Sequence, residues 1–250
     1  PYTGQFQKLL RMKKIIRDIV LGGVGYWDYD IQNCHYTIMN QLGNDYGLRT
    51  FNSFDNYIKN KSKIRKSLSK ELKVDVSIIK ECIIAILYGC KKSVGDKNKL
   101  TELLGRDKHL KLLQNDWIIE LFGDREDITN SIIEKTIREP KKYRWLKLKG
   151  IKKQYFENCR NKRLNYLDEN GKKTQNRFVL AHILQGIESK MLDICMGVEL
   201  GRVGVLIHDG FVTRGTIDET KYSTAIENEL GISVKFDKKK LDCELDHVVF

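Results

Sequence analysis

Acidic residues stand at two points in the sequence where apolar, strand-like runs come to an end. Asp28 and Asp30 follow a short apolar approach, and Asp209 interrupts the stretch VGVLIHDGFV at 203–212. Asp-Gly is a common two-residue turn, so the second stretch is typical of a plain β-hairpin. A hairpin tip is also a rigid support for a metal-binding carboxylate. Two Mg²⁺ ions about 4 Å apart need carboxylates from different elements, and an antiparallel sheet joining these aspartates would supply them.

A second candidate lies in the apolar stretch 75–89, which has helical periodicity and begins with Asp75 as a predicted N-cap. Lys80, Ile84 and Tyr88 are spaced by four residues and therefore share one helical face. A cation, an apolar surface and a phenol on one face suit a nucleoside triphosphate, with the lysine at the phosphates. An ordinary amphipathic helix with a lysine that reaches solvent has the same pattern, so both interpretations stay open.

Hydrophobic periodicity favours an α+β fold in which helices dominate and back a small antiparallel sheet. Helices are predicted at 6–20, 33–42, 54–72, 75–89 and 176–199, two or three more at 98–140, and another from Asp218 or Thr220 to Leu230. Strands are predicted near 24–30, 203–214 and 232–236. Gly43 is expected to end the helix at 33–42.

In chain order these pieces resemble motifs A, B and C of the family A nucleic-acid polymerases, which include the single-subunit RNA polymerases. DYDIQNCH at 28–35 resembles motif A, the K-x7-YG frame at 80–89 resembles motif B, and IHDGF at 207–211 resembles motif C. Gln185 resembles the glutamine that family members place near the primer–template. The D-x-D-x-x-N-x-H pattern looks closer still to the divergent transposon–virus polymerases of virophages and large transposons.

This resemblance spans residues 24–215 and implies the right-hand fold of polymerases, with palm and fingers. The palm, with its small antiparallel sheet, would comprise residues 1–50 and 176–250, and helical fingers would occupy 51–175. The thumb would be absent from this chain, which begins at Pro1 and is expected to be a piece of a longer protein. The implied activity is DNA synthesis from a primer with dNTPs, in replication of a virus-like or mobile element. A helicase or primase module is the further partner implied by the resemblance.

The resemblance also implies roles for individual residues. Asp209 and one motif A aspartate would hold two Mg²⁺ ions, with Mn²⁺ as a possible substitute. The motif A ligand is either Asp30, which puts His35 at the sugar, or Asp28, which puts Asn33 there. The remaining assignments are Lys80 at the phosphates and as proton donor, Ile84 and Tyr88 at the nucleotide, His208 at the primer terminus and Gln185 at the duplex.

Several positions depart from the family pattern. Gly210 stands where DNA polymerases usually have glutamate, Ile84 where they usually have an aromatic residue, and Val76 where most members have a basic one. Motif A has no clear equivalent of the glutamate that commonly blocks a ribose 2′-hydroxyl. A single-subunit DNA-directed RNA polymerase and a catalytically inactive nucleic-acid-binding module therefore remain alternatives.

The chain is strongly basic, with 45 Lys and Arg against 33 Asp and Glu and a net charge of +12. Such an excess favours a polyanionic partner, because phosphate neutralisation releases counterions. Basic residues concentrate at 59–73 and, interleaved with aromatic residues, at 141–163, a composition typical of a nucleic-acid surface. The residues predicted to contact nucleic acid there are Lys59, Lys63, Lys141, Arg144, Lys152 and Arg160.

Six cysteines lack zinc-binding spacing, and several lie in apolar runs, which favours a reduced intracellular compartment. The sequence contains no secretory signal and no apolar run of about 18 residues, so membrane insertion is not expected.

Overall fold

The computed structural model describes residues 25–45, 51–138, 176–207 and 209–241. These form two compact units, each described here by itself. The first, the sheet unit, comprises the described residues up to Cys34 and from Ile187 onward. The second, the helical unit, comprises those from His35 to Gly186. The predicted helix at 6–20 and the basic stretch 141–163 lie outside the described residues.

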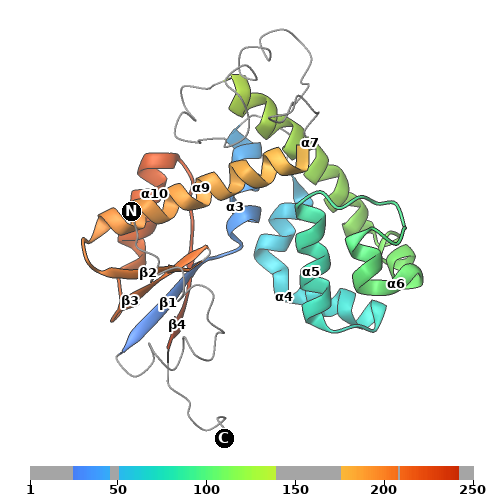
Figure 1. Cartoon of the computed structure of the whole chain (residues 1–250), viewed down its shortest axis with the longest axis horizontal. Coiled ribbons are helices and arrows are strands. Elements are labelled where there is room, and N and C mark those ends of the chain that lie inside the picture. The colour runs from blue at the N-terminus through green and yellow to red at the C-terminus, as the bar shows by residue number, and fades with distance from the viewer. Residues whose placement is uncertain (1–24, 46–50, 139–175, 208, 242–250) are drawn as a thin grey trace, which may run out of the picture. The chain divides into compact units, whose positions relative to one another are not determined.

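The sheet unit is built on a four-stranded antiparallel sheet with strand order β2-β3-β1-β4. Its strands are β1 (Tyr26–Ile31), β2 (Val203–Ile207), β3 (Gly210–Arg214) and β4 (Phe236–Lys240). The first strand among the described residues, β1, thus lies between two strands from the C-terminal part of the chain (Figure 1). Together with the helices described next, this sheet confirms the predicted α+β fold class.

One face of the sheet carries an aromatic core. Tyr29 stacks on Phe211 with ring centroids 5.7 Å apart, and Phe211 stacks on Tyr222 of α10 (Glu219–Leu230) at 5.6 Å. Phe236 of β4 meets the same Phe211 ring edge-on, also at 5.6 Å. All four side chains are buried, so this face is closed to solvent by α10. Burial raises the pKa of Tyr222 to about 12.

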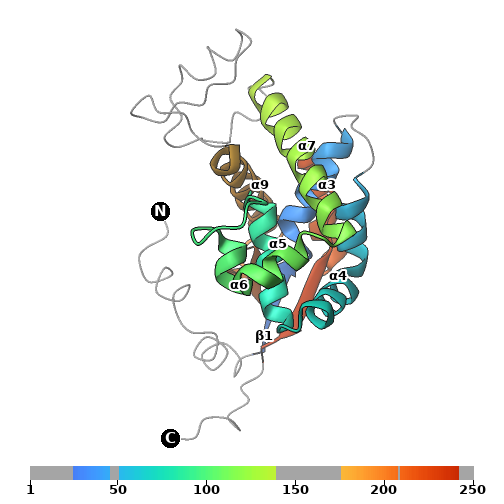
Figure 2. The same cartoon turned by 90° about the vertical axis from the view of Figure 1, so that its right-hand side faces the viewer.

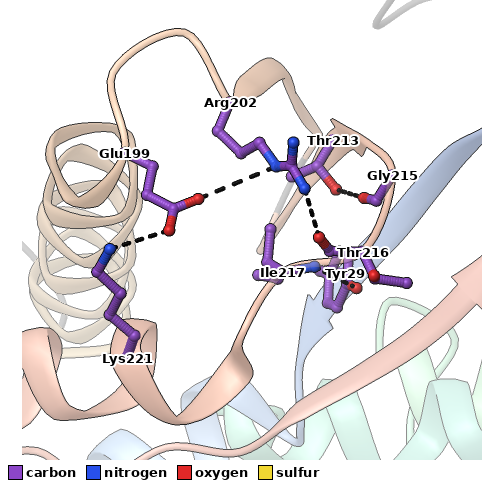
Figure 3. Close-up of polar contacts among 8 residues, drawn as sticks. All are labelled: Tyr29, Glu199, Arg202, Thr213, Gly215, Thr216, Ile217 and Lys221. Atoms are coloured by element: carbon purple, nitrogen blue, oxygen red, sulfur yellow. Dashed lines mark hydrogen bonds and ion pairs between the residues drawn. The ribbon is translucent and has the colours of Figure 1, made fainter.

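Polar contacts tie α10 and the loop before it to the turn between α9 (Asn176–Val198) and β2, as Figure 3 shows. Arg202 donates to the Thr216 carbonyl at 2.7 Å, and Lys221 pairs with Glu199 at 2.9 Å. The backbone N–H of Ile217 donates to the Tyr29 hydroxyl at 3.2 Å. These contacts hold β1 and α10 together around the aromatic core.

The helical unit contains α4 (Asn52–Leu72), α5 (Val76–Leu87), α6 (Lys99–Leu112) and α7 (Asp116–Arg138), which contact one another (Figures 1 and 2). It also contains most of α3 (Cys34–Asp45) and the N-terminal part of α9. Buried Asp124 of α7 accepts from the Ser53 hydroxyl of α4 at 2.8 Å. Asn40 of α3 donates to Asp55 of α4 at 2.8 Å. These side-chain bonds fix three helices against one another.

Helix caps follow the sequence closely. Asp75 accepts from the Ser77 backbone N–H at 2.7 Å and caps α5. Asp218, one of the two predicted alternatives, caps α10 by accepting from Thr220, and Gly231 ends that helix in the left-handed region with φ 68°. All three residues satisfy backbone groups that a helix terminus leaves unbonded.

Three local predictions were wrong. The last strand of the described residues is Phe236–Lys240 and not 232–236, because β4 is an edge strand whose pairing to β1 runs through its charged residues. Gly43 does not end α3, which continues to Asp45. A Cβ at Gly43 would lie 2.9 Å from the Phe51 ring, so this glycine permits a close helix contact. The hairpin turn falls between Ile207 and Gly210, which pair with each other, and not at Asp-Gly.

Candidate active site

Strand register brings the predicted motif A and motif C aspartates to one end of the sheet. Asp30 lies directly opposite Gly210 in the pairing of β1 with β3. The Ile31 N–H donates to the Asp209 carbonyl at 3.0 Å, which fixes the hairpin tip beside the end of β1. Asp30 is exposed and Asp209 is half-buried. Residues separated by some 180 positions in the sequence are therefore neighbours in one antiparallel ladder.

Gly210 is required by this close approach. A Cβ at this position would lie 2.4 Å from Asp30 Oδ1 and 2.4 Å from the Tyr29 carbonyl oxygen. Backbone hydrogen bonds join Gly25 to Gly215 and Ile31 to Asp209, and hydrogen-bonded pairs alternate with non-hydrogen-bonded pairs along an antiparallel ladder. Asp30 and Gly210 therefore form a non-hydrogen-bonded pair, in which the two strands come closest. No side chain fits at position 210 with Asp30 in this place.

The two motif A candidates have different neighbours. Asp28 and Asp30 share one sheet face because they are two residues apart. Asp28 lies opposite Val212 on β3 and Lys239 on β4, whereas Asp30 lies opposite Gly210 and Asp237. Asp28 is half-buried. An apolar and a cationic neighbour suit a carboxylate with a supporting role, while an exposed carboxylate beside a glycine and a second acid suits cation binding.

Asp237 is a candidate residue that the sequence did not reveal. It shares the sheet face of Asp30, and its Oδ1 accepts from Gln32 Nε2 at 2.6 Å. Gln32 follows β1 directly, and its N–H donates to the Lys235 carbonyl at 2.8 Å. The segment FDKKK has no motif, so only the pairing of β4 with β1 places this carboxylate beside Asp30.

A further acidic group at this end of the sheet unit comes from α9. Burial raises the pKa of the Cys34 thiol well above its ordinary value, and the carboxylates of Glu188 and Asp209 add to the rise. Both carboxylates therefore interact electrostatically with Cys34, the first residue of α3. Glu188 lies three residues after Gln185 in the long helix α9. Its sequence context is that of an ordinary surface glutamate, so no sequence signal selects it.

In the helical unit, α5 presents the predicted nucleotide face to solvent. Val76 is 37% exposed and Ile84 is 38% exposed, and exposed Lys80 lies between them at the same four-residue spacing. The opposite face of α5 is buried through Ile79, Ile83 and Ile86. The buried face holds this strongly apolar helix in the unit. The exposed apolar residues on its other face therefore form a surface that a ligand can reach.

Tyr88 and His35 meet at the C-terminal end of this face. The Tyr88 hydroxyl hydrogen-bonds His35 Nδ1, and the two rings contact edge-to-face with centroids 5.5 Å apart. Buried Tyr36, the next residue after His35, donates from its hydroxyl to the Ile83 carbonyl at 3.1 Å and so joins α3 to α5. Asn33, the alternative partner at the sugar, lies before α3 with φ 48° and belongs to the sheet unit.

The structure describes only some of the residues that were predicted to contact nucleic acid. Gln185 is exposed on α9, and Lys59 and Lys63 are exposed on α4, where Lys59 pairs with Asp55 at 3.4 Å. The other predicted contacts lie outside the described residues: His208, Lys141, Arg144, Lys152 and Arg160. No helix among the described residues is long and apolar enough to cross a membrane.

Comparison with known proteins finds similarity among solved structures alone. No protein-family model matches the sequence, and no curated protein is similar to it. Among solved structures, the chain is similar to the POL domain of Pol1 from M. smegmatis, whose structure is a complex with DNA primer–template and dNTP. The TM-score is 0.45 and the sequence identity 14%, over 88% of this chain and 40% of that one.

Proposed function

We propose that this chain is a template-directed nucleotidyltransferase, a DNA polymerase that extends a primer with dNTPs in replication of a virus-like or mobile element. One observation carries the proposal: the end of β1 and the β2–β3 turn, which hold the predicted motif A and motif C aspartates, are joined by the bond between Ile31 and Asp209. In this interpretation residues 1–50 and 176–250, which include the sheet unit, form the palm, and residues 51–175, which include α4 to α7, form the fingers.

The residues at this end of the sheet fit divalent metal ions. Asp30, Asp209 and neighbouring Asp28 offer carboxylate oxygens, the ligands that Mg²⁺ and Mn²⁺ prefer, and substrate phosphates and water complete such sites. Asp30 is the preferred motif A ligand because it is exposed and lies beside Gly210. Bound Mg²⁺ ions would lower the pKa of the primer 3′-hydroxyl and offset charge on the triphosphate.

The α5 face would bind the incoming nucleotide. Lys80 is exposed and would hold the phosphates, where it can also protonate the departing pyrophosphate. Ile84 and Tyr88 would contact the base and sugar. His35 is held against Tyr88 and would limit the space next to the sugar, so it takes the place of the glutamate that motif A lacks.

Nucleic acid would be held mainly through phosphates. Lys59 and Lys63 of α4, the basic stretch 141–163 and Gln185 are the proposed contacts, with His208 at the primer terminus. Contacts of lysine and arginine with phosphates position a strand without reading its sequence, as a replicative enzyme requires. A helicase or primase module as an additional partner belongs to the same proposal.

A single-subunit RNA polymerase is the second candidate. It is favoured by Gly210, whose contact with Asp30 leaves no room for the motif C glutamate of DNA polymerases, and by an imidazole in place of the motif A glutamate. Both candidates use the same carboxylates and differ in the sugar of the product.

The test is extension of a labelled primer on a DNA template with Mg²⁺, with dNTPs and rNTPs in parallel. Asp30→Asn and Asp209→Asn should each abolish extension, whereas Asp28→Asn should retain part of it. Asp193→Asn removes an exposed carboxylate from α9 that pairs with Lys190, and it is the matched control with unchanged extension.

The outcomes separate the alternatives. Incorporation of dNTPs that depends on both aspartates supports the DNA polymerase, and preference for rNTPs transfers the assignment to RNA synthesis. A folded chain that binds primer–template and extends nothing under either condition would leave a nucleic-acid-binding module. If Asp28→Asn were as inactive as Asp209→Asn while Asp30→Asn remained active, the motif A assignment would move to Asp28.

A further inference from the structure

The helical unit contains a cavity of about 360 Å³ whose lining includes none of Val76, Lys80, Ile84 and Tyr88. It is bounded by the loop that follows α5, at Cys90, Lys91 and Lys92, and by one side of α7. From α7 it is lined by Phe122, Arg125, Glu126, Thr129 and Asn130. This volume lies in the range of sites that bind small molecules, and it is large enough for one nucleotide unit.

The lining of the cavity is cationic. The lining contains three cations, Lys91, Lys92 and Arg125, and one anion, Glu126, which gives it a net charge of +2. Lys91 and Lys92 are exposed. The ammonium group of Lys92 lies over the Phe122 ring, 5.4 Å from its centroid, so an aromatic wall holds one of the charges in place.

Arg125 supplies the strongest indication of a ligand. Its Nε atom is buried and has no hydrogen-bond partner among the described residues. Burial lowers the pKa of the guanidinium, and the nearby Glu126 carboxylate opposes this only in part. A buried donor without an acceptor costs free energy. The Arg125 side chain also lines the cavity, where an anion would form charge-assisted hydrogen bonds with its guanidinium.

We propose that the cavity between Cys90–Lys92 and α7 binds a nucleotide phosphate through Arg125, Lys91 and Lys92, and that this phosphate belongs to a single-stranded nucleic acid. The phosphate chemistry rests on the cavity alone. The choice of a nucleic-acid strand rests on the proposed polymerase function, because such an enzyme must hold an unpaired template strand. Phe122 is buried beneath Lys92, so its ring supports this lysine beside the proposed phosphate.

Cys90 provides a direct readout, because its half-buried thiol lines the cavity and donates to Asn98 Oδ1 at 3.1 Å. The other cysteines among the described residues, Cys34, Cys82 and Cys195, are buried. The experiment measures the rate of Cys90 alkylation by iodoacetamide, identified by peptide mass spectrometry, with and without a single-stranded oligo-dT. At ten times the Kd of the oligonucleotide, occupancy slows alkylation of Cys90 about tenfold.

Three variants make the result specific. Arg125→Gln and the double variant Lys91→Gln/Lys92→Gln should lose this protection, and the second keeps the test valid if the first fails to fold. Lys97→Gln removes an exposed charge from the same loop outside the cavity, and protection should persist. Protection should also weaken as salt rises from 50 to 200 mM, because phosphate binding releases counterions.

Thymidine 5′-monophosphate and inorganic phosphate distinguish the source of the phosphate. Protection by oligo-dT at far lower phosphate concentration supports the strand assignment, whereas equal protection by the mononucleotide overturns it in favour of a free nucleotide. Absence of protection by every phosphate, or equal protection in Arg125→Gln, overturns the site itself. Primer extension by the same preparations tests the polymerase proposal separately, since alkylation of Cys90 requires no catalysis.

Discussion

The two units of this protein build their candidate sites in opposite ways. In the helical unit, the candidate site is one face of a single helix, α5, with Lys80, Ile84 and the C-cap Tyr88 one turn apart. The N-cap Asp75 of this helix comes from the same short segment of sequence. In the sheet unit, Asp30 and Asp209 meet only because β1 pairs with β3, which follows it by some 180 residues.

The difference explains where each site is sensitive. A helical face tolerates changes at one position, because each exposed side chain stands on a backbone that the buried face already fixes. A sheet site depends on close contact between strands, and a single added atom at Gly210 meets both a side chain and a backbone oxygen. We therefore expect the largest effects in the sheet unit.

The largest effect is expected for Gly210→Ala. The added methyl would overlap Asp30 Oδ1 and the Tyr29 carbonyl, so overpacking should lower the free energy of unfolding by about 3 kcal/mol. Primer extension should be lost at the same time. Gly204→Ala on β2 is the matched control, because its Cβ would lie 3.6 Å from the Val212 carbonyl, an ordinary contact. Urea unfolding of both variants decides the comparison, and equal stability would contradict it.

Lys80→Gln should impair nucleotide use without affecting the fold. A charged hydrogen bond contributes about 1.5–3 kcal/mol, so kcat/KM for dNTPs should fall about 10- to 100-fold. The free energy of unfolding should stay unchanged, because Lys80 is exposed. Steady-state kinetics and urea unfolding measure the two quantities. A loss of stability with normal kinetics would mean that Lys80 belongs to the fold and not to the site.

His35→Ala should change the choice of sugar. Under the proposed function, removing the imidazole beside Tyr88 should open space next to the sugar of the nucleotide. Relief of a clash of about 1.4 kcal/mol should then raise the ratio of rNTP to dNTP incorporation about tenfold. Tyr88→Phe removes only the hydroxyl and should have a smaller effect on this ratio. Competitive incorporation on one template measures both variants. An unchanged ratio in His35→Ala would remove this residue from sugar selection.

The smallest effect is a pH dependence of stability in the helical unit. His109 is fully buried, and its Nδ1 lies 2.8 Å from Thr101 Oγ1. Burial lowers the pKa of His109 below its ordinary 6.5, so the unfolded chain takes up the proton first as pH falls. The stabilisation is present above pH 6.5 and is lost below it. His109→Gln should flatten the fall in unfolding free energy between pH 7.5 and 5.5, and equal slopes would contradict this assignment.

Local features were the most predictable from the sequence. Asp75 and Asp218 are helix caps because an aspartate before a periodic segment satisfies the first free N–H groups, and both caps are found. The helix at 176–199 and the strands of the hairpin were recognised for the same reason, since their signal lies in neighbouring residues. The strand at 232–236 was misplaced because apolar Ile232 and Val234 suggested a core strand, whereas the edge strand consists of charged residues.

The sequence by itself determined the helix faces, the caps and the chemical types of the candidate ligands, because these depend on residues within one or two turns of each other. The tertiary structure alone decided that Asp30 faces Gly210 while Asp28 faces Lys239, that Asp237 joins the acidic group, and that Tyr36 holds His35 beside Tyr88. It also decided that Arg125 lines a cationic cavity with Lys91 and Lys92. The physical reason is that strand register and helix contacts follow from how the whole chain buries its apolar surface, which no short segment specifies.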